Sequence, residues 1–343
     1  MSPMAVGAAV LIGVFTSAIL TAWVRRYALS SQLLDHPNER SSHTIPTPRG
    51  GGVAIVLSCL MLAGALGALG LIETRLVFAA LGAGALVALL GFIDDRRSLA
   101  ARWRFLGHAA AATWIVFCLE RIPPLPVFGV LVDLQFAGPL LTAVYVVWMI
   151  NLFNFMDGID GIASVEGITT ALGGALVWYL AGRGSGWLLA LVFASCVAGF
   201  LLWNYPPAKI FMGDAGSGFL GLMVALLTLW SGQATPHLFW AWFILCGCFL
   251  VDATTTLLRR VVAGERFYEA HRSHAYQYAA RRHGSHKLVT LTVLAINALW
   301  LLPWAIAVAL QHMDGFVGMS LAFAPLIWLA LRYKAGNRAA QEV

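Results

Sequence analysis

Acidic side chains follow an apolar run in the segment NLFNFMDGIDGIA, residues 151–163, which carries Asp157 and Asp160 three residues apart. Asn151, Asn154 and Asp157 also recur every three residues, so they would line one side of a helix end. Asp160 would continue this row if the helix persists. Oxygen atoms of Asn and Asp suit Mg²⁺, which takes one or two protein ligands and completes its shell with water and phosphate. The segment therefore predicts a site for a divalent cation and a diphosphate substrate.

Further acids end other apolar segments: Asp94 and Asp95 in GFIDDRRS, and Asp214 in FMGDAGSG. A lone aspartate at a helix end more often caps the helix or pairs with a neighbour such as Arg96 or Arg97. Acids on three separate loops at one predicted side of a membrane favour a shared cleft instead, because ionisable groups at a membrane edge are functional candidates.

A basic loop, residues 259–287, contains the short element AHRSH with His271, Arg272 and His274. Most of its basic residues fit a loop lying on anionic lipid. Imidazole beside guanidinium suits the binding of a diphosphate better than contact with the membrane. We therefore assign this element to phosphate or sugar binding. Zinc is not favoured, because no cysteine and no third close ligand accompanies the pair.

Two features leave alternatives open. The loop LLDHPNERSSHTIPTPRGGG is rich in turn formers, and its Ser41, Ser42, His43 and Arg49 either contact a substrate or satisfy the loop itself. Asp252 lies inside an apolar segment. For Asp252 we favour an ion pair or a hydrogen bond with a neighbouring span.

The elements that must position these residues are apolar. The chain has 343 residues, of which 60% are hydrophobic and 11% charged. A soluble domain carries about a quarter charged residues. Spanning a membrane takes about 20 mostly apolar residues, and the sequence predicts an all-α, polytopic membrane protein. Its eleven expected spans are 4–24, 51–71, 76–93, 104–120, 134–153, 164–181, 187–203, 216–232, 237–258, 288–310 and 315–332.

Basic residues predict the orientation of these spans. Alternate loops and the C-terminal tail hold 19 of the 22 lysines and arginines, and the opposite side holds only Arg75, Arg121 and Arg183. We therefore expect the N-terminus outside, the C-terminus in the cytoplasm, and one catalytic domain over 1–343. Its site would form from the loops 25–50, 94–104, 151–163, 204–215 and 259–287. Topology explains the sequence pI of about 9.3 without nucleic-acid binding.

Five motifs in this order resemble a known superfamily: DHPNERSSHTIPTPRGGG, GFIDD, NLFNFMDGIDGIA, NYPPAKIFMGDAGS and AHRSHAYQ. They are similar to those of the polyprenyl-phosphate N-acetylhexosamine-1-phosphate transferases, and the resemblance covers nearly the whole chain. Within the superfamily, the chain looks closest to the initiators of O-antigen and enterobacterial common antigen synthesis. The muramoyl-pentapeptide branch has a lysine where this chain has His43, which disfavours that branch.

The resemblance implies a multi-pass enzyme of the bacterial inner membrane whose site faces the cytoplasm. It would transfer the sugar phosphate of a UDP-N-acetylhexosamine, N-acetylglucosamine or a 6-deoxy relative, to undecaprenyl phosphate and release UMP. Mg²⁺ would be required, with Mn²⁺ as a substitute. The lipid bilayer would be a partner, nucleic acid would not, and a homodimer is compatible with the family.

Residue roles are implied by the same resemblance. Asp94 and Asp95 would bind or deprotonate the lipid phosphate, Asp157 would orient the diphosphate, and Asp214 with Asn154 would hold the metal. The nucleotide would contact Asp160, Asn204 and Phe211, and the phosphates and sugar would contact His271, Arg272, His274 and His43. The histidine motif is spaced differently from the family's. The resemblance therefore does not say which of its imidazoles has which role.

Two other classes remain as alternatives. A secondary transporter also uses membrane carboxylates, but it places them near the bilayer midplane, often within internal repeats. An intramembrane prenyltransferase carries Asp-rich motifs on cytoplasmic loops and would release pyrophosphate rather than UMP.

Overall fold

The computed structural model describes residues 2–35, 45–119, 121–265 and 271–337. Nearly all regular structure in these ranges is helical. The helices are α1 (Pro3–Ser30), α2 (Gly52–Ala68), α3 (Thr74–Arg96), α4 (Ala101–Cys118), η1 (Gln135–Ala137), α5 (Gly138–Met156), α6 (Ile162–Leu180), α7 (Trp187–Asn204), α8 (Asp214–Ala234), α9 (His237–Leu245), α10 (Gly247–Val262), α11 (Ala275–His283), α12 (His286–Ile296), the π-helix η2 (Asn297–Leu301), α13 (Leu302–Ala309) and α14 (Gly315–Arg332). Two short antiparallel pairs complete the fold, β1 (Leu34–Asp35) with β2 (Thr47–Pro48) and β3 (Leu125–Val127) with β4 (Val130–Val132).

Every predicted span overlaps a helix, and the all-α, multi-pass class is confirmed. Within the described residues, seven helices are long and apolar enough to cross a membrane, or eight if α9 and α10 form one span. The expected number of eleven crossings and their sidedness remain predictions. The ninth expected span is not one straight helix, because α9 and α10 meet at an angle of 76°.

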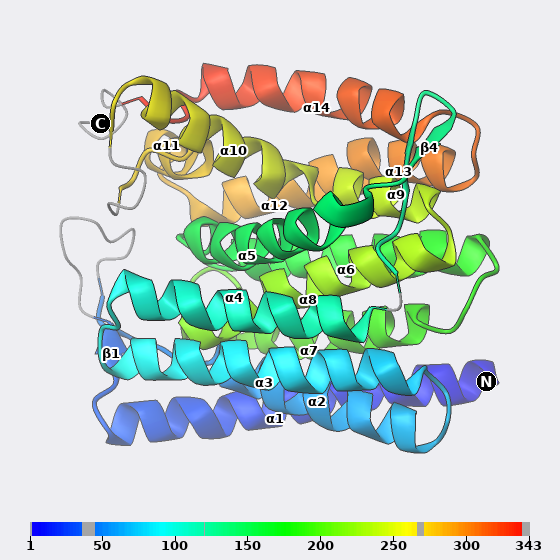
Figure 1. Cartoon of the computed structure of the whole chain (residues 1–343). Helices are drawn as coiled ribbons and strands as arrows, with labels where there is room; N and C mark the ends of the chain where they lie inside the picture. Colours follow the sequence, from blue (N-terminus) through cyan, green and yellow to red (C-terminus); the bar gives the residue numbers. More distant parts are fainter. Residues whose placement is uncertain (1, 36–44, 120, 266–270, 338–343) are drawn as a thin grey trace.

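Helix α8 lies at the centre of the bundle and is buried along its length. It packs against α2, α3, α5, α6 and α9. The helices run side by side, with the N-terminus at one end of the bundle and the C-terminus at the other (Figure 1). Gly91 of α3 allows a close approach, because an added Cβ would collide with the backbone of Asp214 and Ala215. Small residues at helix crossings permit such contact inside a membrane.

Buried polar side chains support the break between α9 and α10. Glu166 accepts a hydrogen bond from the backbone N–H of Phe249 at 3.4 Å, and Thr170 donates to the carbonyl of Leu245 at 3.3 Å. Asn297 donates to the second Glu166 oxygen at 2.6 Å. In apolar surroundings no water can bond the backbone groups that a helix break leaves unpaired. The side chains of Glu166 and Thr170 form hydrogen bonds with such groups instead.

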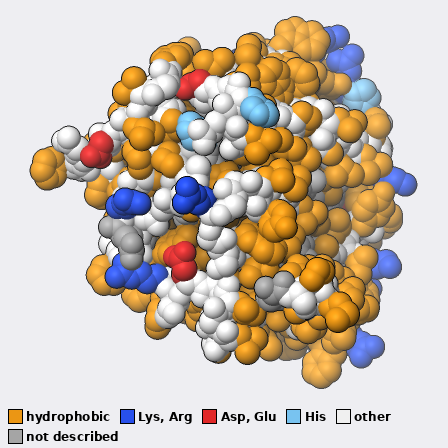
Figure 2. Space-filling model, turned by 90° about the vertical axis from the view of Figure 1, so that its right-hand side faces the viewer, with side chains coloured by type: hydrophobic (Ala, Val, Ile, Leu, Met, Phe, Trp, Pro, Cys, Tyr) orange, Lys and Arg blue, Asp and Glu red, His pale blue; other side chains and the backbone are white. Residues whose placement is uncertain are grey.

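The outer surface agrees with a membrane setting. Large apolar side chains are exposed along α1, for example Leu11, Phe15 and Trp23. Figure 2 looks onto the end of the bundle that carries the N-terminus, where charged side chains are few and scattered among hydrophobic ones. The acidic residues of interest lie at the opposite end, where α3 and α5 finish and α8 begins.

Candidate active site

Asp95, in the last turn of α3, caps the start of α8. Its carboxylate accepts hydrogen bonds from the backbone N–H groups of Asp214 at 3.0 Å and Ala215 at 3.4 Å, and it forms an ion pair with Arg49. Gly213 makes the turn into α8 with φ +77°, and an added Cβ there would lie 2.6 Å from the Asp95 carboxylate. Unpaired N–H groups at a helix N-terminus favour a negative charge. The sequence predicted a catalytic role for Asp95 and did not reveal that its carboxylate caps the N-terminus of α8.

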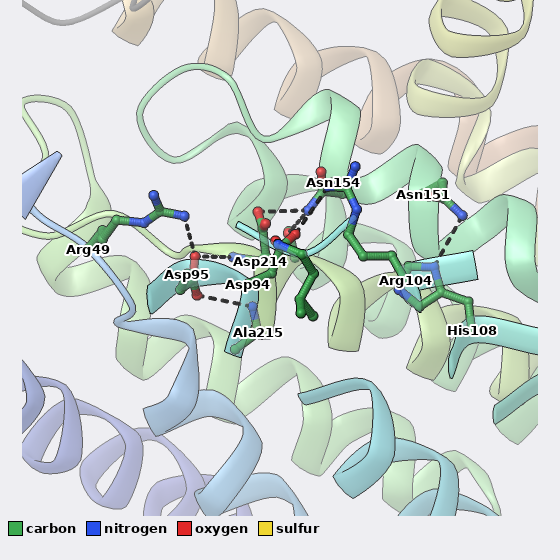
Figure 3. A network of polar contacts seen from close by, with 11 residues as sticks. Arg49, Asp94, Asp95, Arg104, His108, Asn151, Asn154, Asp214 and Ala215 are labelled. Atoms are coloured by element: carbon green, nitrogen blue, oxygen red, sulfur yellow. Dashed lines mark hydrogen bonds and ion pairs between the residues drawn. The ribbon is translucent and has the colours of Figure 1, made fainter. Parts of the chain in front are cut away.

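Asp94 points to a different partner. Its carboxylate accepts from the backbone N–H of Leu99 at 2.6 Å and from Nη1 of Arg104 at 3.1 Å. Arg104 belongs to the first turn of α4. Figure 3 shows Arg49 and Arg104 approaching the acids from opposite sides. Two neighbouring carboxylates thus each bring a guanidinium to the site.

Asn154 joins α5 to α8. Its Nδ2 donates to Asp214 Oδ1 at 2.9 Å and to Ser217 Oγ at 3.2 Å. Asn151, one turn earlier, lies with its Nδ2 3.4 Å from His108 Nδ1 on α4 and donates to the Val147 carbonyl at 2.7 Å. Asn154 therefore contacts Asp214, whereas Asn151 contacts His108 (Figure 3).

Asp157 follows the last residue of α5, so the row of polar residues ends there and Asp160 does not continue it. Burial raises the pKa of Asp157 well above its usual value, and the negative charges of Asp214, Asp95 and Asp160 raise that pKa further. Such mutual repulsion requires the carboxylates to be close together. The structure therefore brings together Asp95 of α3, Asp214 of α8 and Asp157, the residue after α5; their catalytic roles remain predictions.

Asp160 and Asn204 hold the loops beside this site. The Asp160 carboxylate accepts from the backbone N–H of Ala208 at 3.0 Å and lies 3.4 Å from Nδ1 of His286. Asn204 is buried, and its Oδ1 accepts from the backbone N–H of Gly161 at 3.1 Å. Both side chains already connect the 157–161 turn to the 204–213 loop, and their contact with a nucleotide remains a prediction.

Phe211 lies in the second of these loops. Its backbone N–H donates to the Pro48 carbonyl at 2.8 Å, and its carbonyl accepts from Gly51 at 2.9 Å. The loop before α8 is thereby paired with the loop before α2, which carries Arg49. Stacking of the ring on a base remains a prediction.

The two histidines of AHRSH differ in exposure. His274 is 3% exposed, and its Nδ1 lies 3.4 Å from Asp252 Oδ1. His271 is half-buried, and its ring lies 4.9 Å from that of His274. Arg272, between them, accepts a hydrogen bond from Arg281 through its carbonyl. His43 lies outside the described residues.

Arg49 and Arg104 are the partners that sequence reasoning did not assign. Pairing of the acids with the neighbours Arg96 or Arg97 was the less favoured alternative. Arg96 instead lies over the Phe92 ring at 4.3 Å and donates to the Tyr27 hydroxyl at 3.1 Å. A usable signal was the first turn of α4, where Arg104 precedes His108 by four residues and so shares its helix face.

The residues present fit a divalent cation. No group of three or more His, Cys, Asp or Glu side chains with metal-binding geometry occurs in the described part of the chain. Mg²⁺ does not need one, because one or two carboxylates plus substrate phosphates suffice. Burial raises the pKa of Asp157 most, and the neighbouring carboxylates raise it further; a bound cation would relieve this repulsion between the carboxylates.

Comparisons with known proteins show the family. A family model described as Glycosyl transferase family 4 matches residues 77–232. The chain is 33% identical to the decaprenyl-phosphate N-acetylglucosaminephosphotransferase of Mycolicibacterium smegmatis, over 82% of this chain and 78% of the relative.

Two further relatives carry related names. One is a probable undecaprenyl-phosphate N-acetylglucosaminyl 1-phosphate transferase of Bacillus subtilis, 29% identical over 94% of this chain and 90% of the relative. The other is the undecaprenyl-phosphate alpha-N-acetylglucosaminyl 1-phosphate transferase of Thermotoga maritima, 27% identical over 81% of this chain and 83% of the relative. The chain therefore belongs to the polyprenyl-phosphate N-acetylhexosamine-1-phosphate transferase superfamily, within glycosyl transferase family 4.

Proposed function

We propose that this protein transfers N-acetylhexosamine-1-phosphate from a UDP-sugar to undecaprenyl phosphate and releases UMP. The observation that carries the proposal is the gathering of Asp94, Asp95, Asp157 and Asp214 at one end of an apolar helix bundle. The names of the relatives favour N-acetylglucosamine as the sugar over a 6-deoxy relative. Such a product would start a surface polysaccharide, O-antigen in the interpretation given above.

The reaction joins two anions. An oxygen of the lipid phosphate forms a bond to the β-phosphorus of the UDP-sugar, and the bond from that phosphorus to the bridging oxygen breaks, so UMP leaves with that oxygen. Catalysis consists mainly of holding both groups in line and screening their repulsion. Arg104 and Arg49 supply positive charge beside Asp94 and Asp95. Asp94 accepts the proton of the lipid phosphate or orients it.

Mg²⁺ is proposed as the cofactor, with Mn²⁺ as a substitute. Asp214 would be its main ligand and Asn154 a neutral one, because the two side chains are already in contact. Held there, a divalent cation would supply positive charge that offsets the charge of the diphosphate and of the leaving UMP. Asp157, beside them, orients the diphosphate.

Uridine and sugar would be held by the surrounding loops. We assign the uridine side to Asp160, Asn204 and Phe211, whose loops meet beside Asp157. The diphosphate and sugar side is assigned to His271, Arg272, His274 and His43.

The bilayer accounts for the position of the site. A polyprenyl tail remains in hydrocarbon between helices, while its phosphate and the nucleotide meet at the membrane edge. We propose that this edge faces the cytoplasm of the bacterial inner membrane, because the basic residues concentrate in loops at that end.

A panel of radiolabelled UDP-sugars tests the proposal. Purified protein is incubated with undecaprenyl phosphate and Mg²⁺, and water-soluble and lipid products are separated. We expect UMP and a labelled lipid diphosphate from UDP-N-acetylglucosamine. Pyrophosphate release from a prenyl diphosphate would support the prenyltransferase instead. Turnover of none of the UDP-N-acetylhexosamines would overturn the proposal, and solute uptake without product would favour a transporter.

A further inference from the structure

Asp252 is a buried carboxylate with no role in the site described above. It lies in α10, and it is 7% exposed. Its Oδ1 accepts from the backbone N–H of Ala275 at 2.9 Å, and its Oδ2 accepts from that of Tyr276 at 2.9 Å. Thr256, one turn later on α10, donates to Oδ1 at 3.1 Å. Asp252 therefore fixes the first turn of α11 from a separate helix.

The turn that Asp252 fixes continues directly from the histidine element. His274 is the residue that precedes α11, and its Nδ1 lies 3.4 Å from Asp252 Oδ1. The His274 ring in turn lies 4.9 Å from the ring of His271. Burial of His274 against Asp252 leaves His271 and Arg272 as the more exposed members of the element.

The same turn also contacts the Asp157 loop. The Tyr276 hydroxyl donates to the Phe155 carbonyl at 3.0 Å. Gly158 lies directly against this hydroxyl, and an added Cβ there would collide with it. One turn of α11 thus joins Asp252 on one side to the residues flanking Asp157 on the other.

We propose that Asp252 is a positioning residue for the transfer reaction: it holds the first turn of α11 so that the His271–Arg272 element and the Asp157 loop keep a fixed relation. The inference rests on the proposed function, since it names what supports the diphosphate side of that site. Asp252 does not touch the reacting atoms.

A carboxylate is needed because both of its oxygens accept. Asn at this position keeps one acceptor and places an N–H₂ group against a backbone N–H. The variant Asp252→Asn therefore loses one of two anchoring hydrogen bonds and gains a repulsion, at nearly constant volume. The turn can then shift without a cavity being made.

Asp314 offers a matched control. It precedes α14 at the opposite end of the bundle, and its Oδ1 accepts from the backbone N–H groups of Phe316 at 3.0 Å and Val317 at 3.1 Å. Asp314 Oδ2 accepts from the backbone N–H of Gly129 at 3.0 Å, so Asp314→Asn also replaces one of two accepting oxygens, away from the acids. A merely structural role of Asp252 would make the two variants behave alike.

The experiment measures kcat and KM of both variants with UDP-N-acetylglucosamine and undecaprenyl phosphate, beside thermal unfolding in detergent. We expect Asp252→Asn to raise KM for the UDP-sugar about tenfold, with KM for the lipid within about twofold. Asp314→Asn should leave both KM values unchanged. Unchanged kinetics of a folded Asp252→Asn protein, or equal changes in both variants, would overturn the inference.

A second variant keeps the inference testable if Asp252→Asn does not fold. Tyr276→Phe removes only the hydroxyl that reaches Phe155, and it should raise KM for the UDP-sugar in the same way. Normal kinetics of this variant would overturn the inference in that case. An inactive wild-type protein would instead mean that the proposed function fails, so the two failures are distinguishable.

Discussion

Arg104 and Arg102 lie two residues apart at the start of α4, yet only Arg104 contacts an acid of the site. Arg104 pairs with Asp94, whereas the guanidinium of Arg102 lies 5.6 Å from the Trp103 ring. We expect Arg104→Gln to lower kcat/KM by about 10- to 100-fold, because a charge that screens the anionic reactants is lost. Arg102→Gln should stay within about twofold of wild type. Steady-state UMP release checks both, and equal effects would contradict the role of Arg104.

Candidate residues could be chosen where an acid ends an apolar segment. Asp94, Asp157 and Asp214 were chosen this way, because ionisable groups at a membrane edge are costly and are functional candidates. Their partners could not be predicted. Arg49 is 46 residues from Asp95, and only the packing of the 48–52 loop against the 210–212 loop brings it there.

The partner of Asp252 was predicted only in part. A hydrogen bond or ion pair was expected, but with a neighbouring span, whereas the structure shows the carboxylate bonded to the first turn of α11, inside the expected loop 259–287. The sequence alone did not reveal this partner, because no helix was predicted within the basic loop 259–287.

At the scale of elements, the crossing of α3 and α8 sets the distance between Asp95 and Asp214. Gly91 leaves no room for a Cβ against the α8 backbone, whereas Gly64 of α2 has nothing within 4 Å. We expect Gly91→Ala to destabilise the fold by about 1–3 kcal/mol through overpacking and to lower activity. Gly64→Ala should do neither. Thermal unfolding and UMP release measure both effects, and an active, stable Gly91→Ala protein would refute this account of the crossing.

The break between α9 and α10 makes a separate prediction. Asn297→Ala removes the donor that reaches Glu166 and also the hydrogen bond to Thr169 Oγ1 at 2.7 Å. Leaving a buried acceptor without a partner costs about 1–3 kcal/mol. The expected result is a lower unfolding temperature in detergent. Ser320→Ala, which removes an exposed hydroxyl bonded within its own helix, is the control and should show no shift.

Helix positions were predictable because apolar runs of membrane length are visible in the sequence. The α9–α10 break was not, since no proline marks it and its support, Glu166, lies about 80 residues earlier in the chain. The end of α5 at Met156 was only partly visible. Gly158 disfavours a helix there. The position that Asp160 takes instead depends on its contacts with Ala208 and His286.

At the scale of the whole molecule, the predicted orientation can be tested directly. Ser98 lies near the acids and Arg183 lies at the opposite end, and both are exposed. A membrane-impermeant maleimide should label Ser98→Cys only in inside-out vesicles and Arg183→Cys only in right-side-out ones. Four native cysteines are buried and Cys248 is half-buried, so background labelling should be low. The reverse pattern would contradict a cytoplasmic site.

The fold as a whole serves one arrangement: helices that are far apart in the chain present acids and arginines together at one membrane edge. The central claim is that these acids form one metal-dependent transfer site around Asp214. Asp214→Asn tests it well, because the asparagine oxygen can still accept from Asn154 and the fold should persist.

The decisive measurement is UMP release from UDP-N-acetylglucosamine and undecaprenyl phosphate by wild-type and Asp214→Asn protein across a Mg²⁺ titration. We predict that wild-type turnover rises with Mg²⁺ and stops on chelation, and that Asp214→Asn loses about 100-fold or more at every concentration. Asp133→Asn, at the other end of the bundle, should match wild type. Full turnover by Asp214→Asn, or wild-type turnover without any divalent cation, would contradict the account.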